Sequence, residues 1–337
     1  MLSTVDSPTQ RAFGRADVEA AVATCFPGRA VRSAVPLTGG SFGTVWRVGL
    51  AGDQDDLVLK VGPDPAARLL RYEAGMLAAE AEYLRLAAGA PGVPTPRLLA
   101  ERPDYLFMSL IPGVPMPDLP SDTDTRAVRF DSGAAIARLH GVRGPFFGYA
   151  GPRARGGTWP EAFRAMVEAV LDDAVDWDVT LPVAPDAIRS AVAASHDVLA
   201  EVTEPVLVHF DLWDGNVLAI SDDAGVRLGG LVDGERYLFG DPCIDFASPA
   251  LFRDIFDDPD DPFVAGYRSV RPLSTTPSLR RRTWLSQLYL YLVMLVEMPS
   301  RVLDRHGEHA RRWALLADLV TDLLARIDPL AATKPRG

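Results

Sequence analysis

The sequence holds few cysteines, no long apolar run and no excess of basic residues. Its two cysteines, Cys25 and Cys243, are far apart, which excludes a disulfide framework or a zinc site built on closely spaced thiolates. The longest apolar run, Leu288–Val296, is too short to span a bilayer and predicts a buried helix. The net charge of −11 disfavours nucleic acid and anionic membranes as partners and favours a cationic small molecule.

The N-terminal segment Met1–Arg15 lacks the apolar stretch of a signal peptide, and we therefore expect a cytoplasmic protein. The chain has 337 residues, of which 48% are hydrophobic and 23% are charged, as in an ordinary globular protein. This length is sufficient for two lobes and a sizeable core.

Polar groups concentrate in Val206–Asn216, which reads Val-Leu-Val-His-Phe-Asp-Leu-Trp-Asp-Gly-Asn. Its apolar start predicts a short buried strand, and the Asp-Gly pair before Asn216 predicts a turn. Asp211 and Asn216 then share one loop, where a carboxylate and a carboxamide can hold a hydroxyl group and a metal ion together. A second apolar run, Leu228–Val232, predicts a strand that ends at Asp233, with a glycine behind it that permits a sharp bend.

A glycine-rich segment, Thr38–Trp46, follows the β-prone run Val31–Leu37 and predicts a hairpin. Its Gly40, Ser41 and Gly43 would let the backbone approach a ligand closely. An ordinary hairpin uses the same residues, so this segment alone does not identify a ligand.

The strand predicted at Leu57–Lys60 carries one lysine near its end, where the ammonium group can reach the phosphates of a nucleotide. A solvated lysine at a strand end is the simpler alternative. The segment Ala66–Ala88 that follows has helical composition throughout. It offers Glu73, Glu80 and Glu82 as carboxylates that could orient the lysine.

Together these motifs resemble the catalytic centre of kinases, and more closely the aminoglycoside phosphotransferase family with its fructosamine-kinase-like relatives. The pattern His209-x-Asp211-x4-Asn216 is similar to the kinase catalytic loop. Asp233-Gly234-Glu235 stands where the metal-binding motif of kinases follows. Members of the family typically read His-Gly-Asp-Leu-x-x-Gly-Asn, and Phe210 departs from that pattern.

A further match is the Gly-Asp-Pro-x-x-Asp pattern at 240–245. The resemblance implies that Asp245 braces the catalytic loop, and we expect Asp241 and Asp245 to be structural carboxylates that cap backbone N–H groups at a helix start. His140 lies at the predicted end of a helix. We expect it to be a capping or satisfied core histidine rather than a catalytic one.

The resemblance implies an α+β, two-lobed protein-kinase-like fold. Residues 1–111 would form a small β-rich lobe and residues 112–337 a mainly helical one, with the nucleotide between them. The hinge would be Met108–Ile111, where Met108 and Ile111 meet the base. The remaining elements are predicted as a helix at Ala16–Phe26, strands at Arg97–Ala100 and Tyr105–Ser109, helices at Ser121–His140, Phe163–Asp176, Pro185–Glu201, Arg280–Met298 and Glu308–Ile327, and a loop at Gly141–Gly157.

The reaction that the resemblance implies is transfer of the γ-phosphoryl group of ATP, with GTP as the alternative, to a hydroxyl group of a small molecule. Mg²⁺ would be bound by Asn216 and Asp233, whose oxygen atoms suit it. Aminoglycoside-like or other antibiotics, ketoamine sugars and amino alcohols are all open as acceptors. The protein is expected to be a monomer or a homodimer.

The resemblance also gives a role to the other motifs. Asp211 would take the proton of the acceptor hydroxyl group or hold its oxygen in line. Lys60 would hold the non-transferred phosphates. Family position favours Glu80 as the carboxylate that orients this lysine, with Glu73 as the alternative.

Two other functions would use the same residues. A protein of this fold could bind nucleotide without transferring a phosphoryl group, although such proteins have usually lost one of the motif side chains. A metal-dependent phosphohydrolase could use Asp211, Asp233 and Asp241, but it would leave the segment Gly40–Lys60 without a role.

An acidic segment, Arg253–Asp261, follows these motifs and packs five carboxylates into nine residues. Its Asp257 and Asp258, together with Glu235, could attract a basic acceptor by long-range electrostatics. The alternative is a solvated acidic loop without a ligand.

Overall fold

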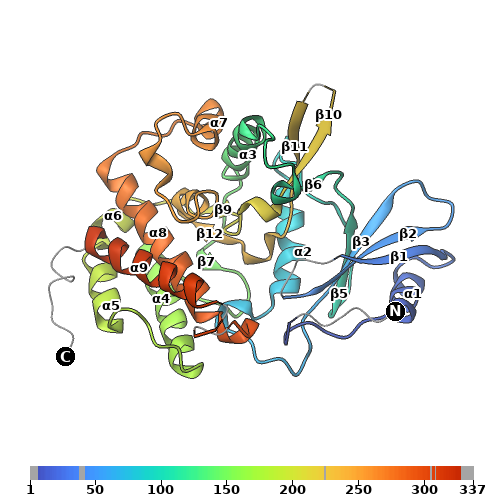
Figure 1. The fold of residues 1–337 in the computed structure, drawn as a ribbon, viewed down its shortest axis with the longest axis horizontal. Coiled ribbons are helices and arrows are strands. Elements are labelled where there is room, and N and C mark those ends of the chain that lie inside the picture. The colour runs from blue at the N-terminus through green and yellow to red at the C-terminus, as the bar shows by residue number, and fades with distance from the viewer. Residues whose placement is uncertain (1–6, 38–41, 224, 304–305, 308, 328–337) are drawn as a thin grey trace.

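The computed structural model of the chain describes residues 7–37, 42–223, 225–303, 306–307 and 309–327. A β-rich part made by the first third of the chain lies beside a larger, mainly helical part (Figure 1). Helix α2 (Met76–Ala87) lies between the two.

The β-rich part is one five-stranded antiparallel sheet with the order β1–β2–β3–β5–β4. Helix α1 (Arg15–Cys25) packs against it, and the buried side chains of Val18, Trp46 and Phe107 contribute to the shared core. The strands are β1 (Val31–Leu37), β2 (Thr44–Leu50), β3 (Asp56–Val61), β4 (Leu98–Glu101) and β5 (Tyr105–Ser109). These bounds agree within two residues with the strands predicted at 31–37, 57–60, 97–100 and 105–109.

The helix predicted over Ala66–Ala88 is wrong in its first half. That segment contains only a short 3-10 helix, η1 (Arg71–Glu73), before α2 begins at Met76. Gly75 separates them with a φ of 74°, a left-handed conformation that glycine adopts without steric cost. Residues 71–73 are held by tertiary contacts instead, since the backbone N–H of Arg71 donates to the Asp173 carboxylate at 2.9 Å. Helical composition could not predict such contacts.

Two small antiparallel sheets frame the centre of the helical part. One has the order β11–β10–β6 and the other the order β8–β7–β12–β9. The loop predicted at Gly141–Gly157 is therefore partly wrong, because it contains β7 and β8. The strands are β6 (Val114–Pro115), β7 (Phe147–Tyr149), β8 (Arg155–Gly156), β9 (Val206–Val208), β10 (Val217–Asp222), β11 (Gly225–Leu231) and β12 (Leu238–Gly240).

Helix α8 packs against α4, α6 and α9, and its residues 285–296 are all buried. The buried helix predicted from the apolar run at 288–296 is thus confirmed. Helix α3 begins at Arg126 rather than near Ser121, and the helix predicted at 185–201 is divided into α5 and α6. The helices are α3 (Arg126–Leu139), α4 (Trp159–Asp176), α5 (Pro185–Ala193), α6 (His196–Ala200), α7 (Pro262–Val270), α8 (Pro277–Val296) and α9 (Ala310–Ile327). Of the helices in the described ranges, none combines the length and the apolarity needed to cross a membrane.

Candidate active site

The loop that follows β9 is built around a buried histidine. His209 Nε2 lies 3.0 Å from the carbonyl oxygen of Val232, and His209 Nδ1 lies 3.3 Å from the backbone nitrogen of Asp211. Because the Asp211 N–H can only donate, Nδ1 is the acceptor and Nε2 carries the proton. The ring therefore joins the loop to the end of β11, and its role is to shape the loop.

Asp245 supports this loop from η5 (Pro242–Phe246). One carboxylate oxygen accepts the backbone N–H of His209 at 2.8 Å, and the other accepts that of Phe210 at 2.7 Å. Asp245 therefore braces the loop, as the resemblance implied, but it does not cap the start of η5. Asp241 is the residue that caps η5, because it accepts the Cys243 N–H at 3.0 Å. His140 is fully buried, with its ring nitrogens 2.9 Å from Tyr267 Oη and 3.0 Å from Asp245, which confirms a satisfied core histidine.

The Asp211 carboxylate is largely buried beside Arg236. Asp211 Oδ2 lies 3.5 Å from Arg236 Nε. Burial raises the pKa of Asp211 above its usual value, and the positive charge of Arg236 opposes that increase. A desolvated carboxylate of this kind can act on a hydroxyl proton if the acceptor binds within hydrogen-bonding distance.

Asn216 ends the short 3-10 helix η3 (Asp214–Asn216) that follows the loop. Its side-chain amide donates to the Asp211 carbonyl oxygen at 2.7 Å, so the amide oxygen is the atom left to face a cation. The carbonyl oxygen of Asn216 accepts the Val232 N–H at 3.0 Å. This bond ties Asn216 to the segment that carries Asp233.

Asp233 begins the turn into η4 (Gly234–Arg236) with a φ of 65°, a left-handed conformation that is rare for residues other than glycine. Such strain is characteristic of residues at functional sites. Gly234 follows it, and a Cβ atom at this position would lie 2.1 Å from the Tyr83 ring of α2. Glycine therefore allows the turn to pack directly on α2.

Lys60 lies at the point where the carboxylates of Glu80, Asp233 and Glu235 meet. Its Nζ atom lies 2.5 Å from Glu80 Oε2, 2.5 Å from Asp233 Oδ1 and 2.8 Å from Glu235 Oε2. Burial disfavours the ammonium form, but the three negative charges outweigh it and raise the pKa of Lys60 well above its usual value. The ion pair expected between Lys60 and Glu80 is present.

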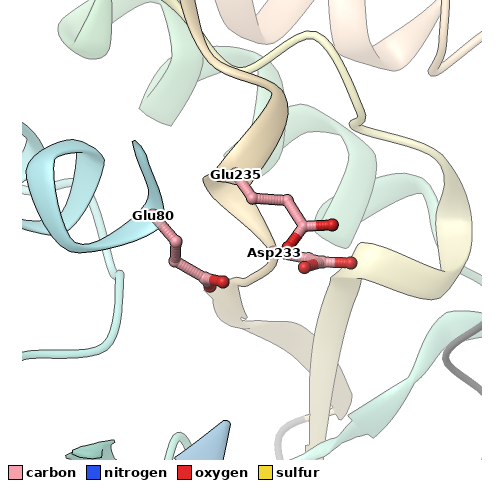
Figure 2. Close-up of side chains that lie close together, drawn as sticks. All are labelled: Glu80, Asp233 and Glu235. Carbon is pink, nitrogen blue, oxygen red and sulfur yellow. The ribbon is translucent and has the colours of Figure 1, made fainter. Parts of the chain in front are cut away.

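The carboxylates around Lys60 carry more negative charge than one ammonium group neutralises. Ligand atoms of Glu80, Asp233 and Glu235 lie within 4.8 Å of one another, drawn in Figure 2 without the lysine. Burial raises the pKa of Glu235 to about 7, while the attraction of Lys60 lowers that of Asp233 despite burial. Oxygen-rich surroundings with excess negative charge fit Mg²⁺, for which Asp233 and the Asn216 amide oxygen are suitable ligands.

Three of the other predicted nucleotide contacts, Gly43, Met108 and Ile111, lie within the described residues. Gly43 lies against the end of β3, because a Cβ atom there would be 2.8 Å from the Val61 carbonyl oxygen. Met108 is buried in β5, and Ile111 lies against Gly230 of β11. The predicted contacts at Gly40 and Ser41 fall on residues outside the described ranges.

Glu73 is not the partner of Lys60. It is fully buried and forms an ion pair with Arg301, which lies beyond the end of α8. The predicted substrate residues have different partners from one another. Glu235 contacts Lys60, whereas Asp257 forms an ion pair with Arg280. Among the described residues, neither Asp257 nor Asp258 forms a hydrogen bond or ion pair with the catalytic loop, and their substrate role stays a prediction.

Sequence reasoning missed the residues that surround Asp211. Arg236 directly follows the Asp233-Gly234-Glu235 motif, and it also pairs with Glu297, which marks the end of the apolar run of α8. Glu297 is a charged residue directly after a buried apolar run, and this position could have indicated that it has a buried partner. Tyr72 gave none, because its hydroxyl group meets Glu297 across 225 positions of sequence.

Residues 33–281 match the model of the phosphotransferase enzyme family, whereas no curated protein matches the chain. A solved structure assigned as a fructosamine-3-kinase from Thermobifida fusca YX-ER1 is 25% identical, with a TM-score of 0.66, and the match covers 92% of this chain and 100% of that one.

Two further solved structures share the fold at 17% identity. Macrolide 2′-phosphotransferase MphH from Brachybacterium faecium matches with a TM-score of 0.55 over 95% of this chain and 98% of its own. Aminoglycoside phosphotransferase APH(4)-Ia, solved as a mutant with AMP-PNP and hygromycin B, matches with a TM-score of 0.59 over 92% of this chain and 98% of its own. The two-lobed protein-kinase-like fold predicted from the sequence is confirmed.

Proposed function

This chain belongs to the phosphotransferase enzyme family and is a small-molecule kinase, and from that premise we propose that it transfers the γ-phosphoryl group of ATP to a hydroxyl group of its acceptor. The acceptor oxygen forms a bond to phosphorus while the bond between the γ-phosphorus and the β–γ bridging oxygen breaks. ADP leaves, and the hydroxyl proton passes to Asp211.

The observation that carries this proposal is the contact of Lys60 with both Glu80 and Asp233. It brings a strand, a helix and the turn after β11 to one point, as the phosphate side of a kinase site requires. Lys60, oriented by Glu80, binds the non-transferred phosphates. Asn216 and Asp233 would hold Mg²⁺, which when bound would neutralise phosphate charge.

The nucleotide lies between the β-rich lobe of residues 1–111 and the helical lobe of residues 112–337 in this proposal. The glycine-rich residues Gly40, Ser41 and Gly43 cover the phosphates, and backbone groups of the segment 108–111 meet the base. The chain directly after this hinge packs closely on β11, because a Cβ atom at Gly229 would lie 2.6 Å from the Pro112 carbonyl oxygen.

The two rival functions are less well supported. A protein that binds nucleotide without transferring a phosphoryl group has usually lost one of the motif side chains. This chain retains Lys60, Asp211, Asn216 and Asp233. A phosphohydrolase would need a free carboxylate at Asp241, but that group caps η5 and lies 2.9 Å from Nε of the partly buried Arg282 of α8.

The test is a coupled assay of ADP release with ATP and Mg²⁺ and one acceptor at a time. Fructosyl-lysine, hygromycin B, erythromycin and choline represent the ketoamine, aminoglycoside, macrolide and amino alcohol classes. Repeating the assay with GTP measures nucleotide preference. Acceptor-dependent ADP release by the wild-type protein supports the proposal.

The matched control in this assay is Asp211→Asn. It should bind AMP-PNP normally and lose turnover by about 10²–10⁴-fold, the usual contribution of acid–base assistance. Wild-type turnover by this variant would exclude Asp211 as the catalytic carboxylate.

A further inference from the structure

Arg236 is the one polar group that the described structure places against the Asp211 carboxylate. Arg236 Nε lies 3.5 Å from Asp211 Oδ2, and in the described ranges no other hydrogen bond or ion pair reaches that side-chain carboxylate. Asp211 and Arg236 are both largely buried, with side chains that are 17% and 14% exposed. The direction in which Asp211 points therefore depends on where Arg236 is held.

Arg236 is itself held by a second carboxylate. Its Nη2 atom lies 3.2 Å from Glu297 Oε2, and the Glu297 side chain is only 10% exposed. The same Glu297 oxygen accepts the hydroxyl group of Tyr72 at 2.7 Å. The guanidinium carbon of Arg236 also lies 5.3 Å from the centre of the Tyr72 ring. One face and two nitrogens of the guanidinium group are thus fixed.

Arg153 fixes the backbone on both sides of this arrangement. It is buried, and its Nη1 atom donates to the carbonyl oxygen of Glu235 at 3.2 Å and to that of Tyr72 at 3.5 Å. Neither η1 nor η4 can move without breaking these bonds. Tyr72 and Arg236 therefore keep their relative positions.

A planar guanidinium group is well suited to this task. Its donors have a fixed geometry, so two carboxylates bound to it are set at a defined distance and orientation. A buried carboxylate without such a partner would adopt other rotamers or turn toward water, and misplacement by about 1 Å can cost about 10²-fold in rate.

We propose that Arg236 positions the catalytic carboxylate of Asp211, and that Glu297 and Tyr72 hold Arg236 for this purpose. This inference rests on the proposed phosphoryl transfer, because it assigns Asp211 the catalytic role. Arg236 acts through Asp211 in this arrangement. It is not required for nucleotide binding.

The experiment is a double-mutant cycle with Arg236→Gln, Asp211→Asn and the combined variant, measured as ADP release with ATP and the most active acceptor of the panel. Arg236→Gln should lower kcat by about 10²-fold. In the Asp211→Asn background the same change should lower kcat by no more than about twofold, because the group that it positions is already disabled. The KM for ATP and the affinity for AMP-PNP should not change.

Two further variants separate positioning from general loss of structure. Arg236→Lys keeps a cation beside Asp211 and should recover part of the lost kcat. Arg282→Gln is the matched control, because the Arg282 side chain is 13% exposed and pairs with Asp241 and Glu201 and not with Asp211. It should lower the Tm without lowering kcat.

The outcomes distinguish this inference from the proposed function. If the wild-type protein is active and the losses from Arg236→Gln and Asp211→Asn multiply in the combined variant, Arg236 acts independently of Asp211 and the inference is wrong. Loss of AMP-PNP affinity in Arg236→Gln overturns it as well. A wild-type protein that releases no ADP with any acceptor overturns the proposed function, and the inference with it.

Discussion

The ring of Phe210 stacks on the ring of Tyr289, with 5.5 Å between centroids and 22° between planes. The Phe210 backbone has a φ of 68°, in the left-handed region that favours glycine. Phe210 occupies the position where the family pattern has glycine. Phenylalanine strains the backbone of this loop, but its ring is fully buried in a contact with α8.

This strain predicts an unusual order of stability at position 210. Phe210→Ala should lower the free energy of unfolding by about 3–5 kcal/mol, since it removes a buried ring and keeps the strained φ. Phe210→Gly removes the same ring and relieves the strain, so it should be more stable than the alanine variant by about 1 kcal/mol. Urea unfolding of both variants measures the difference.

Phe163 is the control for that comparison. It is equally buried but lies within helix α4, where glycine is less favourable than alanine by about 1 kcal/mol. The alanine variant should therefore be the more stable one at this position. The same order at positions 163 and 210 would contradict the explanation from backbone strain.

Glu80 and Glu73 should differ in what their replacement damages. Glu80→Gln weakens the hold on Lys60 and should lower kcat, as a partial version of Lys60→Ala. Glu73→Gln leaves the buried guanidinium of Arg301 without its carboxylate, which should lower the free energy of unfolding by about 3–5 kcal/mol. Kinetic and unfolding measurements on both variants test this division. A larger loss of kcat in Glu73→Gln would contradict it.

Metal binding gives a prediction about Mg²⁺ titrations. Asn216→Ala and Asp233→Ala each remove an oxygen ligand, so the Mg²⁺ concentration for half-maximal activity should rise by at least about tenfold. Asp214→Ala is the control, since this carboxylate lies in the same loop but pairs with Arg129. Equal Mg²⁺ requirements in all three variants would remove the metal site from Asn216 and Asp233.

If the acceptor is basic, the acidic segment at 253–261 should contribute to its binding. Its kcat/KM should fall as ionic strength rises, and Asp257→Asn combined with Asp258→Asn should raise KM more than it lowers kcat. The effect should be modest, because Arg280 already offsets the charge of Asp257. A neutral acceptor with salt-independent kinetics would instead favour a sugar-type substrate.

The sequence by itself determined the elements that carry the site. Apolar runs before Asp211 and Asp233 formed strands β9 and β11, because such runs gain free energy by burial whatever surrounds them. The order and spacing of the motifs were sufficient to predict the two-lobed fold. Lys60 on its strand and Glu80 on its helix could be paired in advance, since the resemblance to the family favoured Glu80 over Glu73 as the partner of the lysine.

Only the tertiary structure decided which charges meet across long separations in sequence. Composition predicted one helix over 66–88, but contacts of residues 71–73 with the helical lobe broke it. Glu73 forms an ion pair with Arg301 there, and Glu235, which was predicted to attract a basic acceptor, contacts Lys60. Arg236 met both Asp211 and Glu297. Ion pairs of this kind depend on the three-dimensional positions of side chains on separately folded elements, and no local pattern records those positions.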